Sequence, residues 1–454
     1  MYIYKHIGNN AFSISVLELF FLLIIFIFIY IYANYKANKN HTETSNKYLK
    51  NALIFRLVIS IVYALISFFV YAGDSVTYFH NIHCFTNVLI ENPKHYFDII
   101  ILGNKPEFFS YFNNETLYPA HYMWRSGTAF TVTRLFAPFL IISKNSYLIS
   151  SIVASLLVFT GIWKLFKTLC KIYPGMEKKI AIAILYFPSL VFWSSGILKD
   201  SLCICAIGWI IYAFYELVIL RKVRLKYFII LFFASLIIIN IKAYIFAAIV
   251  PGLFIWAFFG QMKAIKSKII KFLLAPAILG VLILVFILLM KNASEYMGVF
   301  GDLDSTLAQA SVVQQDLVRH EQYGHNYYDI GKFEATPMGV LKKFPIATIS
   351  GIYRPFLWEA GNPFILLAAL EGTFLFLFMI YVIFKTGFLR FFRIIFSDPF
   401  LIFSLSFVII FGFGVGLATA NFGALVRYKI PLLPFYVASL FIIEYIYNKK
   451  KSLK

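Results

Sequence analysis

Residues Leu57–Val70, LVISIVYALISFFV, contain no charged side chain, and Tyr71–His80, YAGDSVTYFH, follow them directly. Asp74 is the first carboxylate after this apolar run. A helix of about 20 apolar residues spans the ~30 Å hydrocarbon core of a membrane. The stretch therefore predicts a helix that crosses a membrane, with Asp74 at the point where the chain leaves it.

The composition of the whole chain supports the same interpretation. Of its 454 residues, 61% are hydrophobic, 19% are aromatic and only 14% are charged. A soluble domain of this length needs a larger charged fraction to cover its surface. The apolar residues also gather in blocks of about 20, the length of a spanning helix. We therefore expect a single all-α polytopic membrane domain over residues 1–454.

The apolar blocks predict about eleven transmembrane helices. We expect them at residues 14–33, 53–72, 146–166, 180–195, 198–217, 227–241, 243–259, 270–290, 363–384, 397–416 and 430–447. The run Thr128–Ser143 is an exception, because it is short and contains Arg134 and Pro138. Counting it as a span would invert every later helix, so we expect an interfacial or re-entrant helix there.

The net charge of +20 comes from basic clusters that lie between or beside the apolar runs. This pattern follows the positive-inside rule and indicates cytoplasmic loops that meet anionic lipid, rather than a surface for nucleic acid. Counting from an outside N-terminus places every cluster and the C-terminus in the cytoplasm. The clusters are Tyr35–Lys50, Lys164–Lys179, Arg221–Lys226, Gln261–Lys271, Lys385–Arg393 and Asn448–Lys454.

Two long segments, residues 73–145 and 292–362, are then expected to be extracytoplasmic. Charged groups at membrane depth are costly and usually face a cavity or a partner. The candidate site residues on this side are Asp74, Lys199, Asp200, Arg354, Glu359 and Arg427, with Tyr78 and His80 close behind Asp74.

Each candidate also has a structural interpretation. Asp74 can lie at a helix end, and Lys199 can pair with Asp200 at the mouth of a helical hairpin. Arg427 can reach outer lipid phosphates. Arg354 can anchor an interfacial turn, since a proline follows it directly.

Taken together, the same residue types suggest a chemistry. Arginine and lysine hold phosphate or pyrophosphate, and arginine offers a bidentate fork. The Asp74 carboxylate can act as general base toward a sugar hydroxyl. Tyr78 offers a face for a sugar ring, and His80 is expected to hydrogen bond at the interface. This combination indicates transfer of a sugar from a polyprenyl-linked donor.

The sequence indicates no definite cofactor. Its four cysteines are scattered, without the spacing of a zinc site or a disulfide framework. The chain contains no glycine motif for ATP or dinucleotides. The acidic residues are too dispersed to define a metal site, so the use of a divalent cation is left open.

The layout around Asp74 resembles the shared module of the GT-C superfamily, polytopic glycosyltransferases that use polyprenyl-phosphate sugars. A helix ends near an acidic residue, a long outer segment follows, and another helix returns. On this match, Leu57–Ala72 is the first helix of the module, Asp74 in GDSVTY takes the place of the acidic base, and Leu17–Ala33 is an extra helix. Many members carry a paired acidic motif, whereas Ser75 follows Asp74 here.

Three further stretches look like phrases found in bacterial envelope-glycan membrane proteins: FPSLVFWSSGILKDS, YRPFLWEAGNP and NFGALVRYKIPLLPF. The resemblance implies a glycosyltransferase of the bacterial inner membrane with a polyprenyl-linked donor and a lipid or glycan acceptor. One alternative is an O-antigen or capsule polymerase or ligase, in which Arg354 and Arg427 handle pyrophosphate. Another is a lipid-linked saccharide transporter, although the predicted spans are nearly bare of charge, with Arg56 and Glu371 near their ends.

Overall fold

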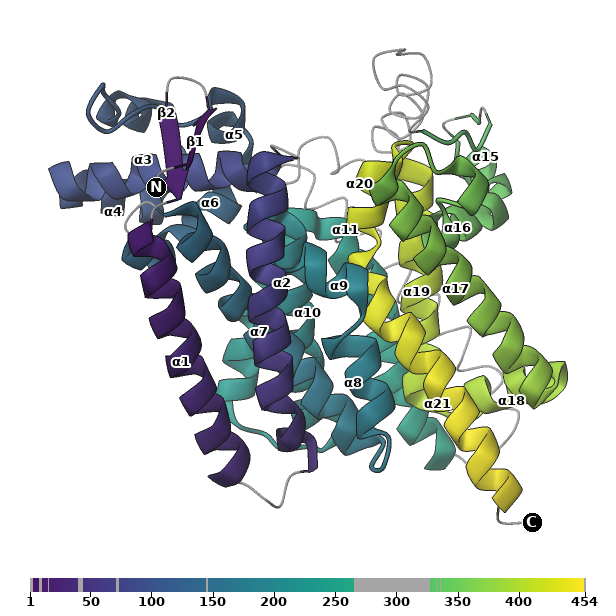
Figure 1. Ribbon diagram of the computed structural model, residues 1–454. Coiled ribbons are helices and arrows are strands. Elements are labelled where there is room, and N and C mark those ends of the chain that lie inside the picture. The colour runs from purple at the N-terminus through teal and green to yellow at the C-terminus, as the bar shows by residue number, and fades with distance from the viewer. Residues whose placement is uncertain are drawn as a thin grey trace. The chain divides into compact units, whose positions relative to one another are not determined.

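The computed structural model describes residues 3–7, 10–14, 16–39, 44–70, 73–143, 146–264, 327–331, 333–334 and 336–452. The chain divides into two compact units (Figure 1). Unit 1 comprises Met1–Lys242 and unit 2 comprises Ala243–Lys454.

Long apolar helices form the body of unit 1. They are α1 (Val16–Lys39), α2 (Leu49–Phe69, after the short helix η1, Thr44–Tyr48), α7 (Tyr147–Ile172) and α10 (Lys199–Phe214), which continues as the π-helix η4 (Tyr215–Ile219). In hydrocarbon every backbone polar group must find its partner within the protein, and a helix achieves this within one segment. The predicted spans at 14–33, 53–72, 146–166 and 198–217 fall on these helices.

The first long segment folds into a layer of shorter helices. These are α3 (Asp74–Glu91), α4 (Pro93–Leu102), η2 (Pro106–Tyr111), α5 (His121–Arg125), α6 (Gly127–Leu140) and η3 (Ile141–Ser143). Figure 1 shows α3 lying across one end of the long helices of unit 1. Phe85 packs with Phe112, Trp124 and Phe130 inside this layer. The segment predicted at Thr128–Ser143 is helical and is too short to count among the spanning helices.

A proline divides the predicted span 180–195. Two short helices lie there, α8 (Glu177–Leu185) and α9 (Pro188–Trp193). Proline lacks an N–H group and disfavours helical geometry at the preceding residue. Phe187 accordingly has an extended backbone, with ψ of 122°. A single continuous helix was therefore the wrong expectation for this segment.

Glycines allow α7 and α10 to approach closely. A Cβ atom on Gly161 would lie 2.0 Å from the Cys205 carbonyl oxygen, and one on Gly208 would lie 2.0 Å from the Gly161 carbonyl oxygen. Small residues at helix contacts bring backbones together, which strengthens packing where lipid supplies no hydrophobic driving force.

Helix α11 (Leu225–Ala264) is broken at Lys242, whose φ of −148° and ψ of 75° are not helical. The division between the two units falls after the same residue. The two parts correspond to the predicted spans 227–241 and 243–259. Within unit 2, Trp256 of the second part packs on Phe400 and Phe403.

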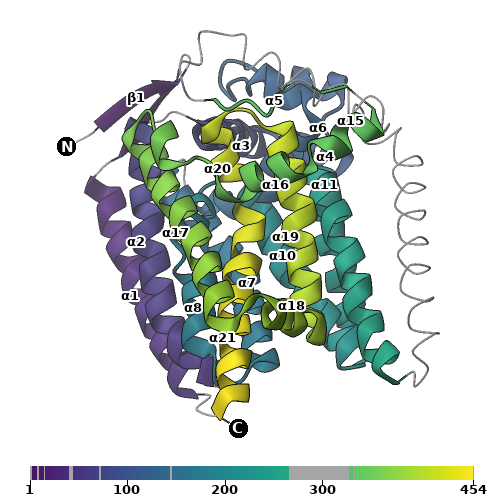
Figure 2. The same ribbon diagram turned by 90° about the vertical axis from the view of Figure 1, so that its right-hand side faces the viewer.

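Unit 2 contains three further long helices, α17 (Pro363–Thr386), α19 (Pro399–Ala418) and α21 (Leu433–Ser452) (Figure 2). The shorter elements are α15 (Pro337–Lys342), α16 (Phe344–Tyr353), η7 (Leu357–Glu359), α18 (Phe388–Ser397), α20 (Phe422–Tyr428) and η8 (Ile430–Leu432). Helix α18 was expected only as a basic loop. It buries Phe391, Ile394 and Ile395 and exposes Arg390 and Arg393.

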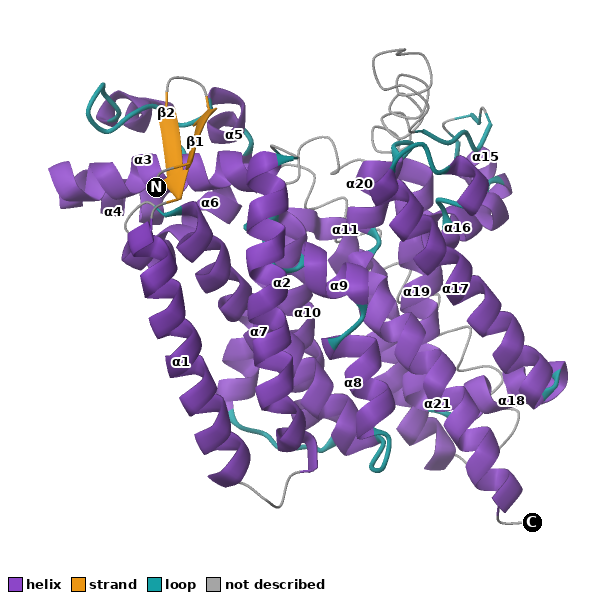
Figure 3. Ribbon diagram, in the orientation of Figure 1, coloured by secondary structure: helices purple, strands orange, loops and turns teal. Residues whose placement is uncertain are grey.

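The chain is predominantly helical (Figure 3). The strands β1 (Ile3–Ile7) and β2 (Asn10–Ile14) form an antiparallel hairpin that the all-α prediction did not include. Among the described residues, eight helices are long and apolar enough to cross a membrane. The prediction of a helical multi-pass membrane protein is confirmed, while the count of eleven stays a prediction. The predicted span 270–290 and most of the 292–362 segment lie outside the described residues.

Candidate functional site

Asp74 begins α3 and does not cap α2. It is the first helical residue after the N-cap Gly73, so its carboxylate lies in the first turn of α3. A negative charge there is favoured by the partial positive charge of the helix N-terminus. The position of Asp74 at the start of α3 agrees with its structural interpretation as a helix-end residue. A catalytic role would be a second role beside this one.

Ser75 joins Asp74 to two other elements of unit 1. Its Oγ accepts hydrogen bonds from the hydroxyl of Tyr147 and from the N–H of Ile197, each at 3.2 Å. The Tyr147 hydroxyl also lies 2.5 Å from the Ser67 hydroxyl of α2. The residue that departs from the paired acidic motif is thus a buried link between α3, α7 and the turn before α10.

Lys199 extends this arrangement to α6. Its Nζ donates to the Thr128 hydroxyl at 2.7 Å. We call Asp74, Ser75, Thr128, Tyr147, Ile197 and Lys199 the polar layer. Four helices begin in it, namely α3, α6, α7 and α10. Their N-terminal partial charges make this end of unit 1 favourable for an anion.

Asp200 has a partner that the sequence did not suggest. Its Oδ1 lies 2.5 Å from the Nζ of Lys242, and the two side chains are 2% and 8% exposed. Lys242 is the non-helical residue of α11, so the ion pair ties the break in α11 to the first turn of α10. Sequence reasoning missed Lys242, although its position between two apolar runs was a signal.

Tyr78 and His80 are buried within the layer of short helices. Tyr78 is 2% exposed, so its ring offers no open face to a sugar, unlike the exposed rings of Tyr118 and Tyr122. The Nε2 of His80 lies 2.9 Å from the Tyr118 carbonyl oxygen, to which it can only donate. Burial lowers the pKa of the His80 imidazole. Both side chains are buried inside the layer of short helices and contribute to its packing.

Arg56 is a second buried charge in unit 1. Its Nε donates to the Ser155 hydroxyl at 2.7 Å and its Nη1 to the Ser194 hydroxyl at 2.6 Å. Nη2 donates to the Ser194 carbonyl at the end of α9. These bonds hold the turn between α9 and α10 against α2 and α7. Arg56 is 2% exposed and lies within α2 (Leu49–Phe69), whereas the sequence predicted it near the end of a span.

In unit 2, Arg354 and Glu359 form an ion pair around a turn. The Nε of Arg354 lies 3.4 Å from Oε1 of Glu359, whose Oε2 accepts the Phe356 N–H at 2.8 Å. The guanidinium also lies 5.0 Å from the ring centroid of Tyr328 and 5.7 Å from that of Phe356. Both the anchoring role and a phosphate-binding role fit this arrangement.

Arg427 lies in α20, and its guanidinium is 5.4 Å from the ring centroid of Tyr428. Lys429 follows two residues later and is fully buried. Its Nζ donates to the Arg354 carbonyl oxygen at 3.1 Å. Lys429 therefore links the segments that carry Arg354 and Arg427, and sequence reasoning did not single it out.

The candidates thus fall into two groups. Asp74, Lys199 and Asp200 share unit 1 with the two buried residues of α3, and Arg354, Glu359 and Arg427 share unit 2. Among the described residues, no group of three or more His, Cys, Asp or Glu side chains is placed to hold a metal ion.

The long apolar helices of both units define a helical multi-pass membrane protein. No protein-family model, no curated protein and no solved structure matches the chain.

Proposed function

We propose that the protein is a membrane glycosyltransferase of the GT-C kind, which transfers a sugar from a polyprenyl-linked donor to an envelope glycan or lipid acceptor. The observation that best supports this proposal is the polar layer. In this layer Ser75, which directly follows Asp74, accepts from the N–H of Ile197, two residues before Lys199, and Lys199 donates to the Thr128 hydroxyl.

In this proposal Asp74 is the general base. The acceptor hydroxyl gives its proton to the Asp74 carboxylate as its oxygen forms a bond to the anomeric carbon of the donor. The bond between that carbon and the donor phosphate breaks, and polyprenyl phosphate leaves with the electron pair. Lys199 and the N-termini of α6 and α10 compensate the charge on this leaving phosphate.

The cations of unit 2 favour a second candidate, an O-antigen or capsule polymerase or ligase. Arg354 combines a guanidinium group with two aromatic neighbours, and Lys429 orients its backbone. Arginine binds phosphate or pyrophosphate in a bidentate manner, which suits an undecaprenyl-pyrophosphate substrate. In this candidate Arg354 and Arg427 matter more than Asp74.

We propose the bacterial inner membrane as the location, with the N-terminus outside and the C-terminus in the cytoplasm. The basic segment Lys164–Lys179 supports this orientation, because it lies at the end of unit 1 opposite α3 (Figure 1). The positive-inside rule assigns such an end to the cytoplasm. Asp74 would then act on the outer side.

Asp74→Asn tests the proposal, because it keeps the size of the side chain but removes its basicity. We expect glycan product from a purified polyprenyl-linked donor to fall by about 10²–10⁴-fold, the usual contribution of a general base. The amount of protein in the membrane should not change. Asp98→Asn in α4 is the matched control and should keep its activity. Near wild-type activity in Asp74→Asn would refute the catalytic assignment and favour the second candidate.

A further inference from the structure

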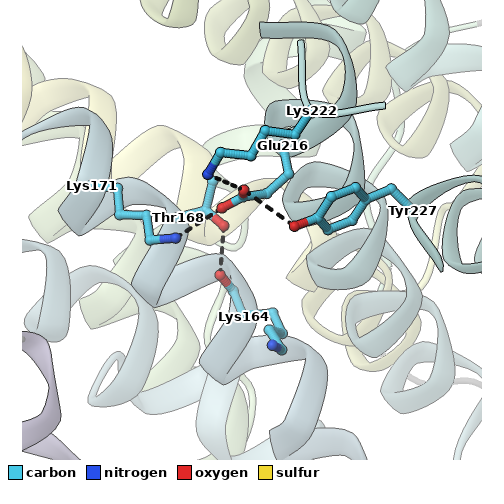
Figure 4. A network of polar contacts seen from close by, with 6 residues as sticks. All are labelled: Lys164, Thr168, Lys171, Glu216, Lys222 and Tyr227. Carbon is cyan, nitrogen blue, oxygen red and sulfur yellow. Dashed lines mark hydrogen bonds and ion pairs between the residues drawn. The ribbon is translucent and has the colours of Figure 1, made fainter. Parts of the chain in front are cut away.

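Glu216 is a buried carboxylate in η4, which continues α10 away from the polar layer. Figure 4 shows its surroundings. Glu216 of η4 accepts from Lys171 at 2.8 Å, from Lys222 at 2.9 Å and from the Tyr227 hydroxyl at 3.3 Å. The Glu216 side chain is 3% exposed, whereas those of Lys171 and Lys222 are 44% and 48% exposed. Glu216 therefore holds two lysines in place while leaving them accessible.

The backbone after η4 brings Lys222 back to this carboxylate. The N–H of Leu220 donates to the Tyr215 carbonyl at 2.9 Å, and the N–H of Lys222 donates to the Glu216 carbonyl at 2.9 Å. Arg221 between them has a φ of +54°, in the left-handed region where glycine is the usual residue. The turn thus adopts an unfavourable backbone conformation that positions Lys222, and π-helical turns of this kind are frequent at functional sites.

Positive charge exceeds negative charge in this cluster. We call Lys164, Thr168, Lys171, Glu216, Lys222 and Tyr227 the Glu216 network (Figure 4). Three lysines and one glutamate leave an excess of positive charge, and Glu216 raises the pKa of Lys222 through its hydrogen bond. Lys164 lies two turns before Lys171 on α7, with its Nζ 5.0 Å from the Trp209 ring centroid and 4.3 Å from that of Tyr212.

Apolar side chains beside the network indicate what kind of anion fits. Val223 and Leu225 are strongly exposed, and Phe228 is half exposed one turn further along α11. Aromatic residues such as Trp209 and Tyr212 are typical of the boundary between hydrocarbon and water. A ligand that contacts both the lysines and these apolar side chains needs an anionic group and an apolar tail, a combination that an anionic phospholipid offers.

We propose that the Glu216 network binds the phosphate headgroup of an anionic membrane lipid. Lys171 and Lys222 contact the phosphate, and Lys164 adds a further positive charge along α7. Glu216 orients the two lysines and also competes with the lipid for them. Basic side chains at a membrane surface are attracted to anionic lipid in this way. The site is separate from the polar layer and does not depend on the proposed transferase activity.

The test is lipid retention by the purified full-length protein, measured by native mass spectrometry with phosphatidylglycerol or phosphatidylcholine added. Lys171→Gln and Lys222→Gln should each lower phosphatidylglycerol retention about fivefold, the contribution of one lysine near an anionic surface. Phosphatidylcholine retention should not change. Glu216→Gln should raise phosphatidylglycerol retention, because the lysines lose their competing carboxylate. Lys178→Gln, an exposed change in α8 outside the network, is the matched control.

Lys171→Arg keeps the positive charge and should retain phosphatidylglycerol at the wild-type level. A loss in Lys171→Gln alone would then reflect the missing charge and not misfolding. Wild-type retention in both lysine-to-glutamine variants, with Glu216→Gln also unchanged, would overturn the proposal and leave the network a structural one. Displacement of the lipid by inorganic phosphate, with the same dependence on both lysines, would overturn the lipid assignment in favour of a soluble phosphate.

Discussion

Individual buried charges in this protein form ion pairs or hydrogen bonds with residues far along the chain. Asp200 pairs with Lys242, and Arg56 donates to Ser155 and Ser194. Removing an ion from water costs several kcal/mol, which only a close partner or several hydrogen bonds offset. These residues therefore position the turn before α10, next to Lys199 of the polar layer.

Lys242→Met should destabilise the protein, because it leaves the Asp200 carboxylate buried without its ammonium. We expect a loss of roughly 3–5 kcal/mol, the usual cost of breaking a buried ion pair from one side. Thermal unfolding in detergent micelles should show this loss of stability as a lower midpoint temperature.

The double variant Asp200→Asn with Lys242→Met should recover much of this loss, since no lone charge remains. Lys199→Ala is the control and should unfold close to wild type. If Lys199→Ala and Lys242→Met were equally damaging, the assignment of Lys242 as the main partner of Asp200 would be wrong.

Arg427→Lys separates a phosphate ligand from a lipid anchor. Lysine keeps the charge but loses the bidentate fork, so a phosphate-binding arginine should tolerate lysine little better than alanine. We expect the same pattern, more weakly, at Arg354, because Glu359 already occupies part of its guanidinium. Product formation from a purified polyprenyl-linked donor is the measurement. Full activity in Arg427→Lys would identify a headgroup anchor instead.

At the scale of elements, glycines decide which helices touch. In unit 2, a Cβ atom on Gly351 of α16 would lie 1.9 Å from the Gly412 carbonyl oxygen of α19. One on Gly416 would lie 1.9 Å from the Ala347 carbonyl oxygen. This reciprocal pattern of small residues four apart holds α16 directly against α19. It thereby sets the position of Arg354, which follows the end of α16.

Gly416→Ala and Gly414→Ala form a matched pair on the same helix. The methyl group that Gly416→Ala adds would collide with backbone, and overpacking of this kind costs about 1–3 kcal/mol. A Cβ on Gly414 meets nothing within 4 Å, so alanine there should be neutral or stabilise the helix. Thermal midpoints in detergent compare the two variants. Equal midpoints would show that α16 and α19 are not in backbone contact at Gly416.

At the scale of the whole molecule, the basic clusters indicate the orientation of the chain in the membrane. Within unit 1, α3, which begins at Asp74, and α5 lie at the end opposite the Lys164–Lys179 and Arg221–Lys226 clusters (Figure 1). A positive-inside orientation would put α5 outside and the turn before α11 in the cytoplasm. This arrangement would place the proposed sugar transfer on the outer face.

Single cysteines introduced at Tyr122 and Val223 test this orientation, since these side chains are 64% and 78% exposed. The four native cysteines are first replaced by serine. An impermeant thiol reagent should label Tyr122→Cys in intact spheroplasts and label Val223→Cys only after lysis. Labelling in the reverse order would invert the topology and place Asp74 in the cytoplasm.

Local sequence predicted the long helices well. The runs that became α2, α7, α17 and α19 were expected at nearly the observed positions, because an uncharged run in hydrocarbon satisfies its backbone only as a helix. One break was not predicted, because Pro188 interrupts an expected span. The break in α11 at Lys242 falls between the predicted spans 227–241 and 243–259.

The sequence by itself thus determined the class of protein and most of its helices, and it singled out polar candidate residues in both units. Only the tertiary structure decided how those residues pair. In the folded protein Asp200 forms an ion pair with Lys242, Tyr78 is buried, and Ser75 hydrogen bonds to two other elements. The physical reason is that hydropathy depends on each residue and its near neighbours, whereas pairing depends on how one helix is rotated and placed against another. That rotation is set by distant contacts such as Gly161 against Gly208, which no single segment contains.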